Sequence, residues 1–167
     1  MTILLEASHA GKTFSTGGFI SRSVTHALRD FSLAIDVEQP IVTAIAGESG
    51  SGKTTLARML LGVIAPSSGS VRYKGVDVHT MKRDQWRAFR QDVQAIYQDP
   101  FEVYNPFYRV DHVLTTPVAK FKLARTPAEA RDLIESTLRK VGLRPEETLG
   151  RYPHQLSGGQ RQRIMIA

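Results

Sequence analysis

The sequence predicts an α/β fold: a parallel-sheet core preceded by an antiparallel β subdomain and followed by a helical subdomain. Three observations lead to this prediction. Residues 41–46 form a short apolar run with β-branched residues, which is typical of a strand buried on both faces of a parallel sheet. Glycines and an amphipathic helix pattern follow this run at once, and the chain beyond residue 110 has helical periodicity. The 167 residues suit one ordinary domain rather than two.

The first 36 residues favour strands. Residues 3–5 open one strand, and residues 27–35 alternate well enough for another. The stretch 11–25 between them, with Gly17 and Gly18, predicts a hairpin or a loop. Residues 70–73 predict a further short strand.

Helical spacing of apolar residues predicts two helices in the middle of the chain. The first is indicated by Leu56, Met59, Leu60 and Val63 and is stopped by the turn signals at 66–69. The second covers 81–93, with Trp86, Phe89 and Val93 on one face, and leads into a predicted strand at 94–97.

Turn signals at 99–100 and 105–106 separate these elements from two predicted helices. The first helix covers about 110–121. The second opens at a capping box, Thr126 to Glu129, with Pro127 at the first helical position, and Gly142 closes it. Its apolar face is Ala130, Leu133, Ile134, Leu138 and Val141.

Composition excludes several classes of protein. Hydrophobic residues at 41% and charged residues at 23% indicate a globular chain, and no apolar run approaches the roughly 20 residues that span a bilayer. The N-terminus has no signal-peptide pattern. The absence of cysteine excludes disulfides, thiolate metal sites and cysteine nucleophiles. The net charge of +6 suits an anionic partner. The basic residues are dispersed along the sequence, however, so we expect most of them to lie on the solvent-exposed surface.

One motif carries specific chemistry. Residues 47–54, Gly-Glu-Ser-Gly-Ser-Gly-Lys-Thr, fit the P-loop pattern of a nucleoside triphosphate-binding fold, here a RecA-like core, between a predicted strand and a predicted helix. The alternative is a flexible glycine turn with a surface lysine. Lys53 is expected to meet the β- and γ-phosphates of a nucleoside triphosphate and Thr54 to ligate Mg²⁺. The predicted phosphate-binding residues are Gly47, Ser49, Gly50, Ser51, Gly52, Lys53, Thr54 and Thr55.

A second motif, Leu-Ser-Gly-Gly-Gln at 156–160, has two interpretations. Ser157 and Gln160 form a possible capping box, with which any helix could begin. Gly158 and Gly159 favour a binding role in addition to capping. Two glycines destabilise the start of a helix, and this cost is explained if another group must approach the backbone closely. The physical inference is a second anion-binding helix terminus.

With these motifs and the glutamine of Tyr97-Gln98-Asp99-Pro100, the sequence resembles the ATP-binding cassette (ABC) ATPases. The resemblance implies that Ser157, Gly158, Gly159 and Gln160 meet the γ-phosphate of ATP held by a second subunit, in a head-to-tail dimer. It implies that Gln98 lies beside Mg²⁺ and the γ-phosphate, so that Lys53 and Gln98 are the catalytic residues and Thr54 and Gln98 the metal ligands. Phe14 matches the aromatic position that stacks on adenine. Phe19 is the other candidate for that position, and the alternative for Phe14 is an ordinary core or partly exposed phenylalanine.

Within this family, residues 98–101, 105–106 and 152–163 look most like the ATPase subunits of peptide, dipeptide and nickel importers. That resemblance implies transmembrane permease subunits and a second ATPase subunit as partners, no nucleic acid, and a peripheral place on the cytoplasmic face of the membrane. It divides the chain into a β subdomain with P-loop core at 1–97 and a helical subdomain with the signature motif at 98–163.

The resemblance covers the whole chain but only about the first two-thirds of such a domain. The family's following strand ending in Asp-Glu, its Asp-containing loop and its switch histidine are absent from these 167 residues. We therefore expect an isolated chain that is unstable and hydrolyses ATP negligibly. Two other functions stay open: a soluble ABC ATPase acting on nucleic acid or ribosomes, and a fragment that binds nucleotide without hydrolysing it.

Overall fold

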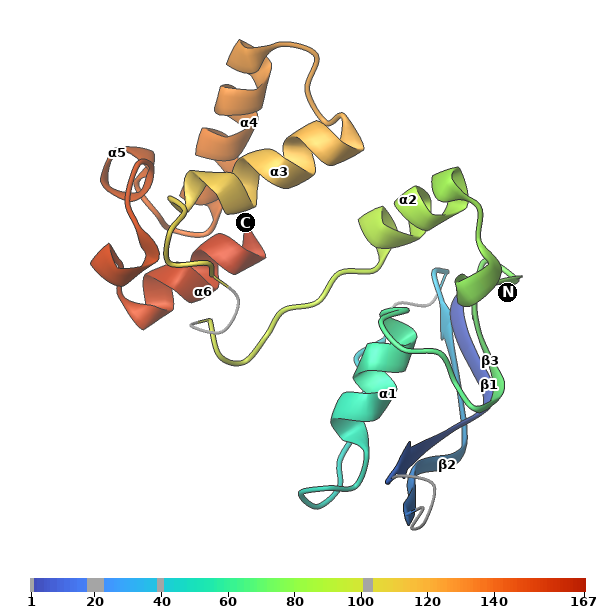
Figure 1. The fold of residues 1–167 in the computed structure, drawn as a ribbon. Coiled ribbons are helices and arrows are strands. Elements are labelled where there is room, and N and C mark those ends of the chain that lie inside the picture. The colour runs from blue at the N-terminus through green and yellow to red at the C-terminus, as the bar shows by residue number, and fades with distance from the viewer. Residues whose placement is uncertain (1, 18–22, 39–40, 101–103) are drawn as a thin grey trace. The chain divides into compact units, whose positions relative to one another are not determined.

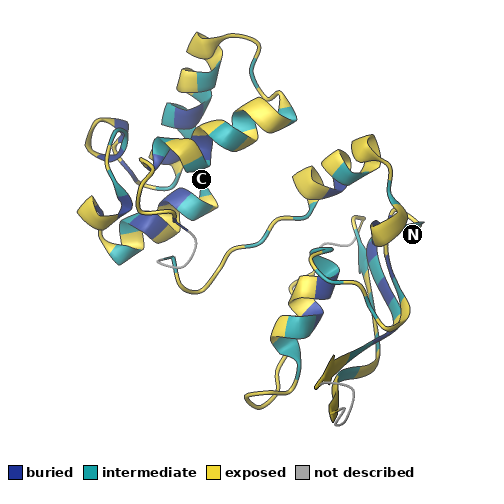
Figure 2. Cartoon of the chain, viewed as in Figure 1, coloured by how far each residue is buried: buried dark blue, intermediate teal, exposed yellow. Residues whose placement is uncertain are grey.

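The computed structural model describes residues 2–17, 23–38, 41–100 and 104–167, and the chain divides into two units (Figure 1). Unit 1 spans Met1–Gln94 and unit 2 spans Ala95–Ala167. Each unit has its own cluster of buried apolar residues. Figure 2 colours the buried positions of the ribbon dark blue in both units. No helix among the described residues is long and apolar enough to cross a membrane.

Unit 1 is organised by an antiparallel sheet of four described strands in the order β2-β1-β3-β4. The strands are β1 (Ile3–Thr16), β2 (Ser23–Asp36), β3 (Ser68–Tyr73) and β4 (Val76–Asp77). The predicted strands at 3–5, 27–35 and 70–73 are confirmed. The stretch 11–25 is a hairpin, the first of its two interpretations, because β1 and β2 pair antiparallel out to Thr16 and Ser23. The strands therefore run further than the predicted segments, and bulges absorb the irregular pattern. Gly18 lies outside the described residues.

Two helices cover unit 1, as their apolar spacing predicts. Helix α1 (Lys53–Leu60) buries Leu56 and Met59, and helix α2 (Arg83–Asp92) buries Phe89. A short 3-10 helix, η1 (Val78–Thr80), lies between β4 and α2. Val63 was expected on the apolar face of α1 but is exposed, because the helix ends at Leu60. The core is made of Leu5, Ala7, Ala10, Leu56, Met59, Val71, Tyr73, Val78 and Phe89.

Helix α1 is seated directly against β2. A Cβ at Gly52, the residue that caps α1, would overlap the carbonyl oxygen of Ala27. Gly52 also has φ 92, a left-handed conformation that other residues adopt only with strain. Both the close approach and the backbone angle therefore require glycine at the start of α1.

Two predicted strands are wrong. Residues 41–46 and 94–97 have no regular secondary structure, and Ile41 and Val42 are 68% and 100% exposed. A parallel strand needs a hydrogen-bonded neighbour on at least one side, and no described strand pairs with either segment. Apolar, β-branched composition alone therefore did not establish a strand.

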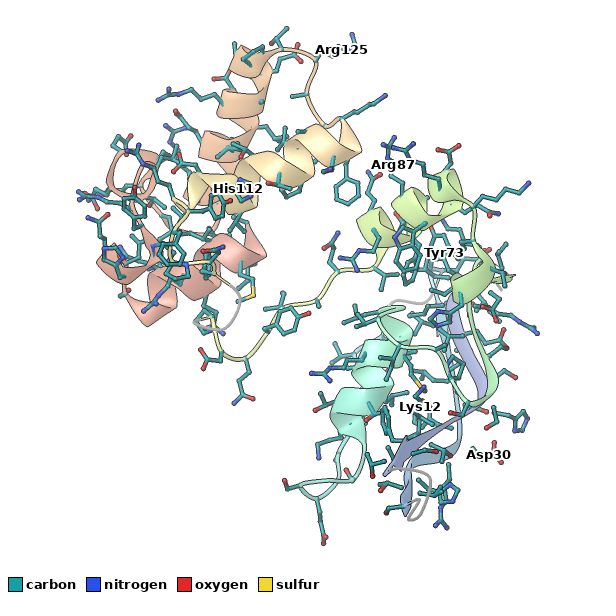
Figure 3. The ribbon with its side chains drawn as sticks, viewed as in Figure 1. Lys12, Asp30, Tyr73, Arg87, His112 and Arg125 are labelled. Carbon is teal, nitrogen blue, oxygen red and sulfur yellow. The ribbon has the colours of Figure 1, made fainter. Side chains whose placement is uncertain are left out.

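Tyr73, labelled in Figure 3, ties β3 to the end of α2. Its hydroxyl donates to Asp92 Oδ2 at 2.6 Å, and Lys74 Nζ donates to the same oxygen at 2.9 Å. The Tyr73 hydroxyl, followed by Lys74, lowers the pKa of the Asp92 carboxyl, and burial raises the pKa of Tyr73. The rings of Tyr73 and Phe89 also pack in a T-shaped arrangement, with centroids 5.4 Å apart.

Unit 2 is helical. Its helices are α3 (Asp111–Phe121), α4 (Pro127–Lys140), α5 (Pro145–Thr148) and α6 (Gly158–Ile166), with the 3-10 helix η2 (Pro153–Gln155) before α6. The core is made of Tyr104, Val110, Leu114, Ile134, Leu138, Leu143, Leu156 and Ile164. The Tyr104 hydroxyl donates to the Arg161 carbonyl at 2.6 Å and so joins the start of the unit to α6. Burial raises the pKa of Tyr104 to about 12.

The ends of α4 follow the sequence signals. Thr126 Oγ1 accepts the Glu129 amide at 3.1 Å, and Pro127 is the first helical residue. At the other end, Gly142 donates to the Arg139 carbonyl and Leu143 to that of Leu138, the paired bonds of a Schellman stop. The predicted Thr126 cap and the glycine stop are confirmed. The full capping box is not, because Glu129 Oε2 accepts the Arg125 amide at 2.7 Å instead of the Thr126 amide.

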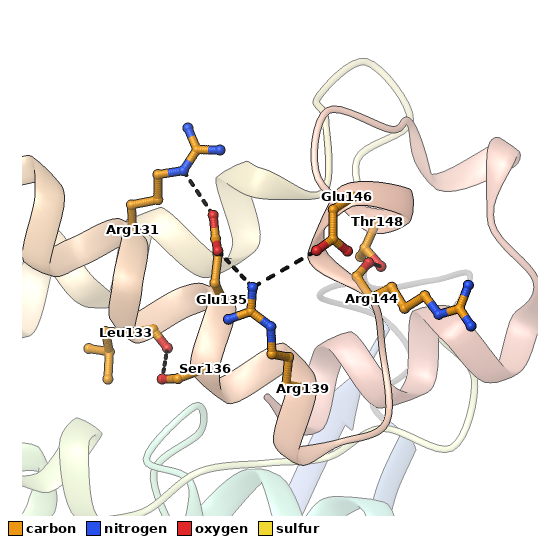
Figure 4. Close-up of polar contacts among 8 residues, drawn as sticks. All are labelled: Arg131, Leu133, Glu135, Ser136, Arg139, Arg144, Glu146 and Thr148. Carbon is orange, nitrogen blue, oxygen red and sulfur yellow. Dashed lines mark hydrogen bonds and ion pairs between the residues drawn. The ribbon is translucent and has the colours of Figure 1, made fainter.

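An ion-pair chain joins α4 to α5 (Figure 4). Glu135 accepts from Arg131 at 2.9 Å and from Arg139 at 3.0 Å, and Arg139 also lies 3.9 Å from Glu146. Arg131 and then Arg139 lower the pKa of the Glu135 carboxyl. Because the arginines are exposed, these pairs add little stability, and the buried apolar residues hold the unit together.

We expect Asp92→Asn to destabilise unit 1 in a pH-dependent manner. The pKa of Asp92 is lower in the folded chain than its usual 3.8, so its stabilising effect is complete above that value and disappears as the pH falls through the folded-state pKa. The difference in thermal midpoint between the variant and the parent chain is expected to be larger at pH 7 than at pH 3. An equal difference at both values contradicts this role of the carboxylate.

Gly52→Ala tests the seating of α1, with Gly75→Ala as the matched control. Gly75 has φ 80, similar to that of Gly52, but a Cβ there meets nothing within 4 Å. The control is expected to lose about 1–2 kcal/mol through backbone strain alone. Gly52→Ala adds the clash with Ala27 and is expected to lose about 2–5 kcal/mol. Urea denaturation measures both losses, and equal losses would show that the contact with Ala27 is unimportant.

Candidate functional site

The glycine-rich loop before α1 has an unusual backbone. Gly50 and Gly52 have φ values of 83 and 92, and the Ser51 amide donates to the Glu48 carbonyl at 3.2 Å. This turn delivers the chain into α1 at Gly52, where no side chain caps the helix. The first amides of an α-helix have no acceptor within the helix and carry a partial positive charge. The start of α1 is therefore suited to an anion.

Lys53 adds a full positive charge at this point. Its ammonium folds back over the loop and donates to the carbonyls of Gly47 and Glu48, each at 2.7 Å, and to Ser51 Oγ at 3.2 Å. Thr54 is exposed in the first turn and Thr55 is half-buried beside it. The loop and the first turn of α1 thus bring together backbone amide donors, the Lys53 ammonium and the exposed Thr54 hydroxyl. Polyphosphate-binding sites use the same set of groups.

The predicted metal ligands are only partly placed. Among the described residues, no group of three or more histidine, aspartate or glutamate side chains could hold a metal ion. Thr54 lies in unit 1, whereas Gln98 is an exposed residue of unit 2. The structure therefore does not bring these two predicted ligands together within one unit. The Thr54 hydroxyl, at the start of α1 beside Lys53, fits a Mg²⁺ ion that is itself bound to phosphate oxygens.

Phe14 lies in β1, opposite Thr25 of β2, and is 40% exposed. It is therefore a partly exposed aromatic on a strand and not a core residue, which agrees both with a stacking role and with the alternative of an ordinary partly exposed phenylalanine. The ammonium of Lys12 lies 5.3 Å from the centroid of its ring. Phe19, the rival aromatic, and Phe101, part of the importer-like pattern, lie outside the described residues.

The motif at 156–160 opens α6. Ser157 Oγ accepts the Gln160 amide at 3.2 Å, and the Ser157 amide donates to Gln160 Oε1 at 2.8 Å, so the capping box is confirmed. Leu156 is buried and anchors the motif in the core of unit 2. Gly159 is exposed, and a Cβ added to it would meet nothing within 4 Å. The fold of this chain therefore does not itself require glycine there.

Sequence reasoning missed the contacts that hold Phe14 in place. Lys12 Nζ donates to the Ala65 carbonyl at 2.7 Å, and Ser67 bonds the backbone of Thr13. Residues 12 and 65 lie far apart in the chain and share no motif or periodicity, so no local signal could have paired them.

Comparisons with known proteins agree with these motifs. The model of the ABC transporter family matches residues 28–167. The di/tripeptide transport ATP-binding protein DppF of Pseudomonas aeruginosa is 39% identical over 153 residues, which are 92% of this chain and 46% of that protein. The nickel import ATP-binding protein NikE of Rhodospirillum rubrum is 36% identical over 169 residues, 100% of this chain and 59% of that protein.

A third relative, the oligopeptide transport ATP-binding protein OppF of Haemophilus influenzae, is 33% identical over 170 residues, 99% of this chain and 50% of that protein. The chain spans about half the length of the curated relatives it matches.

Solved structures show the same fold. A dimeric ATP-binding cassette in a post-hydrolysis state, bound to ADP and Pi, superposes with a TM-score of 0.79 at 24% identity, over 98% of this chain and 67% of that one. The cbiO1 protein of Clostridium perfringens, part of the ABC transporter complex cbiONQ, superposes with a TM-score of 0.73 at 25% identity, over 99% of this chain and 60% of that one. The predicted α/β fold class is confirmed, and the chain belongs to the ABC transporter family.

Proposed function

We propose that this chain is the nucleotide-binding part of an ATP-binding subunit of an ABC importer for peptides or related small solutes. Membership of the ABC transporter family supports ATP as the nucleotide. The names of three relatives, which transport di/tripeptides, oligopeptides and nickel, support import of small solutes. The observation that carries the proposal is the start of α1 at Gly52, where no side chain caps the helix and the Lys53 ammonium folds back beside the free amides.

The phosphates of ATP bind at this loop. Lys53 exchanges its loop carbonyls for the β- and γ-phosphate oxygens, and the backbone amides of Gly50, Ser51 and Gly52 and of the first turn of α1 donate to the same group. Gly47 and Ser49 shape the turn, and Thr54 and Thr55 provide hydroxyls at its end. Thr54 and Gln98 are the residues that would hold Mg²⁺ in this proposal, and the ion would supply positive charge to neutralise the phosphates. Phe14 stacks on the adenine.

A second ATPase subunit completes the site. In this proposal, Ser157, Gly158, Gly159 and Gln160 of one subunit contact the γ-phosphate bound by the partner. The exposed Gly159, with open space at its Cβ position, supports an approach from outside the chain. The amides at the start of α6 offer the same kind of anion site as those of α1.

Association of the two subunits on ATP binding, followed by hydrolysis, drives the transmembrane permease subunits between two states. The subunit is then peripheral, on the cytoplasmic face of the membrane, with no nucleic acid as partner. Lys53 and Gln98 act on the γ-phosphate, Lys53 as a positive charge and Gln98 as a polar group beside the metal.

Lys53→Ala is expected to weaken MgATP binding by more than tenfold, because a cation bound to phosphate contributes on the order of 1.4 kcal/mol or more. Lys140→Ala, which removes an exposed lysine from the end of α4, is the matched control and leaves the affinity unchanged. Titration calorimetry measures both dissociation constants. Equal affinities for parent chain and Lys53→Ala reject the proposed phosphate site.

Gly159→Gln tests the contribution of the α6 motif separately from that of the phosphate-binding loop. A Cβ at this position meets nothing within 4 Å, and helix α6 is expected to gain a few tenths of a kcal/mol to about 1 kcal/mol, since glycine is a poor helix former. MgATP binding at the loop of the same chain is expected to stay intact, whereas ATP-dependent self-association, followed by analytical ultracentrifugation, is lost. A variant that still associates with ATP contradicts the proposed role of the motif.

A further inference from the structure

We propose that Lys12 is a positioning residue that holds the Phe14 ring so that one face of it is presented to the adenine of ATP. This inference rests on the proposed function, since it concerns how the adenine contact is made. Lys12 lies outside the P-loop and the motifs at 97–100 and 156–160, and it belongs to a set of contacts between β1 and the segment that follows α1.

The Lys12 ammonium is fixed from two directions. Its Nζ donates to the Ala65 carbonyl at 2.7 Å and lies 5.3 Å from the centroid of the Phe14 ring (Lys12 is labelled in Figure 3). A lysine at this distance from an aromatic ring is attracted by the negative ring face. Lys12 therefore links the Phe14 ring to the backbone beyond α1.

The backbone before Phe14 is held by the same segment. The Thr13 amide donates to Ser67 Oγ at 3.1 Å, and that hydroxyl donates to the Thr13 carbonyl at 3.3 Å. The Ser67 amide donates to the Gly11 carbonyl at 2.7 Å. Residues 11–13 are thus bonded directly to the chain that leaves α1, so the position of Phe14 is coupled to that helix.

The start of α1 makes the complementary contact. Gly52 lies against the Ala27 carbonyl, and Ala27 falls at a register shift of β1 and β2, where Lys12 pairs with Leu28 but Thr13 pairs with His26. The strand pair that carries Phe14 is therefore held to α1 at Gly52 and to the segment after α1 at Ala65 and Ser67. This double attachment fixes the strand relative to the phosphate-binding loop.

With the strand fixed, the remaining freedom is the rotation of the Phe14 side chain. At 40% exposure, the ring has room to occupy more than one rotamer. The Lys12 cation favours the rotamer in which it faces the ring and leaves the opposite face for a nucleobase. A ring held in advance loses less conformational entropy when the base stacks, so affinity for the base rises while affinity for the phosphates stays the same.

The experiment compares ATP with inorganic triphosphate, which lacks the base, on the 167-residue chain with Mg²⁺. The parent chain is expected to bind ATP more tightly than triphosphate, and Phe14→Ala to reduce this preference. Lys12→Met is expected to weaken ATP binding about two- to fivefold and to leave triphosphate binding unchanged. In the Phe14→Ala background, Lys12→Met is expected to have no further effect, because its role depends on the ring.

Three further variants refine the comparison. Lys12→Arg keeps a cation that can face the ring and is expected to restore most of the preference for ATP. Lys12→Gln keeps a hydrogen-bond donor for Ala65 but no charge, and is expected to behave like Lys12→Met. Lys74→Met removes a comparable cation, 4.8 Å from the Tyr73 ring, and is expected to change neither affinity.

Two results overturn the inference. Equal losses of ATP and triphosphate affinity in Lys12→Met would make Lys12 a phosphate ligand or a purely structural residue. Independent, additive effects of Lys12→Met and Phe14→Ala would show that Lys12 does not act through the ring. Failure of the proposed function has a different signature: the parent chain binds neither ligand, or Phe14→Ala leaves the preference for ATP unchanged.

Discussion

The contact between Gly52 and the Ala27 carbonyl is the constraint on which the phosphate-binding loop depends. It places the first turn of α1 against β2, with no room for a side chain between them. Because the helix begins there without a side-chain cap, its first amides remain available to an external anion. The same contact holds the strand pair β1–β2, which carries Phe14, against α1. The positions of the proposed phosphate and adenine sites therefore both depend on the Gly52–Ala27 contact.

The two units contribute different parts of the proposed function. Unit 1 holds the loop, Lys53 and Phe14, whereas unit 2 holds Gln98 and the motif that opens α6. The α6 motif has a self-sufficient capping box, yet its exposed Gly159 fills no structural need within the chain. A glycine that the fold does not require is explained by close approach of another molecule, which in our proposal is nucleotide held by a second subunit.

Local signals predicted much of the fold and of the site. Spacing alone reveals the cap at Thr126, the capping box at Ser157, the glycine stop at Gly142 and the P-loop turn, because each depends on bonds between residues a few positions apart. The predictions of strands at 41–46 and 94–97 were wrong. A strand needs a hydrogen-bonded neighbouring strand, and amino-acid composition does not show whether one is present. The bond from Lys12 to Ala65 could not be predicted either, because the two residues are distant in the sequence and no motif or periodicity connects them.

Amide hydrogen exchange across the start of α1 tests the central claim most directly. The claim is that the backbone amides of residues 50–55 donate to the phosphates of MgATP. Saturating MgATP is expected to slow exchange in this segment, and inorganic triphosphate with Mg²⁺ is expected to slow it as well, because both ligands present the same oxygens. Unchanged exchange at residues 50–55 under saturating MgATP would contradict the account, since the phosphates would then bind elsewhere.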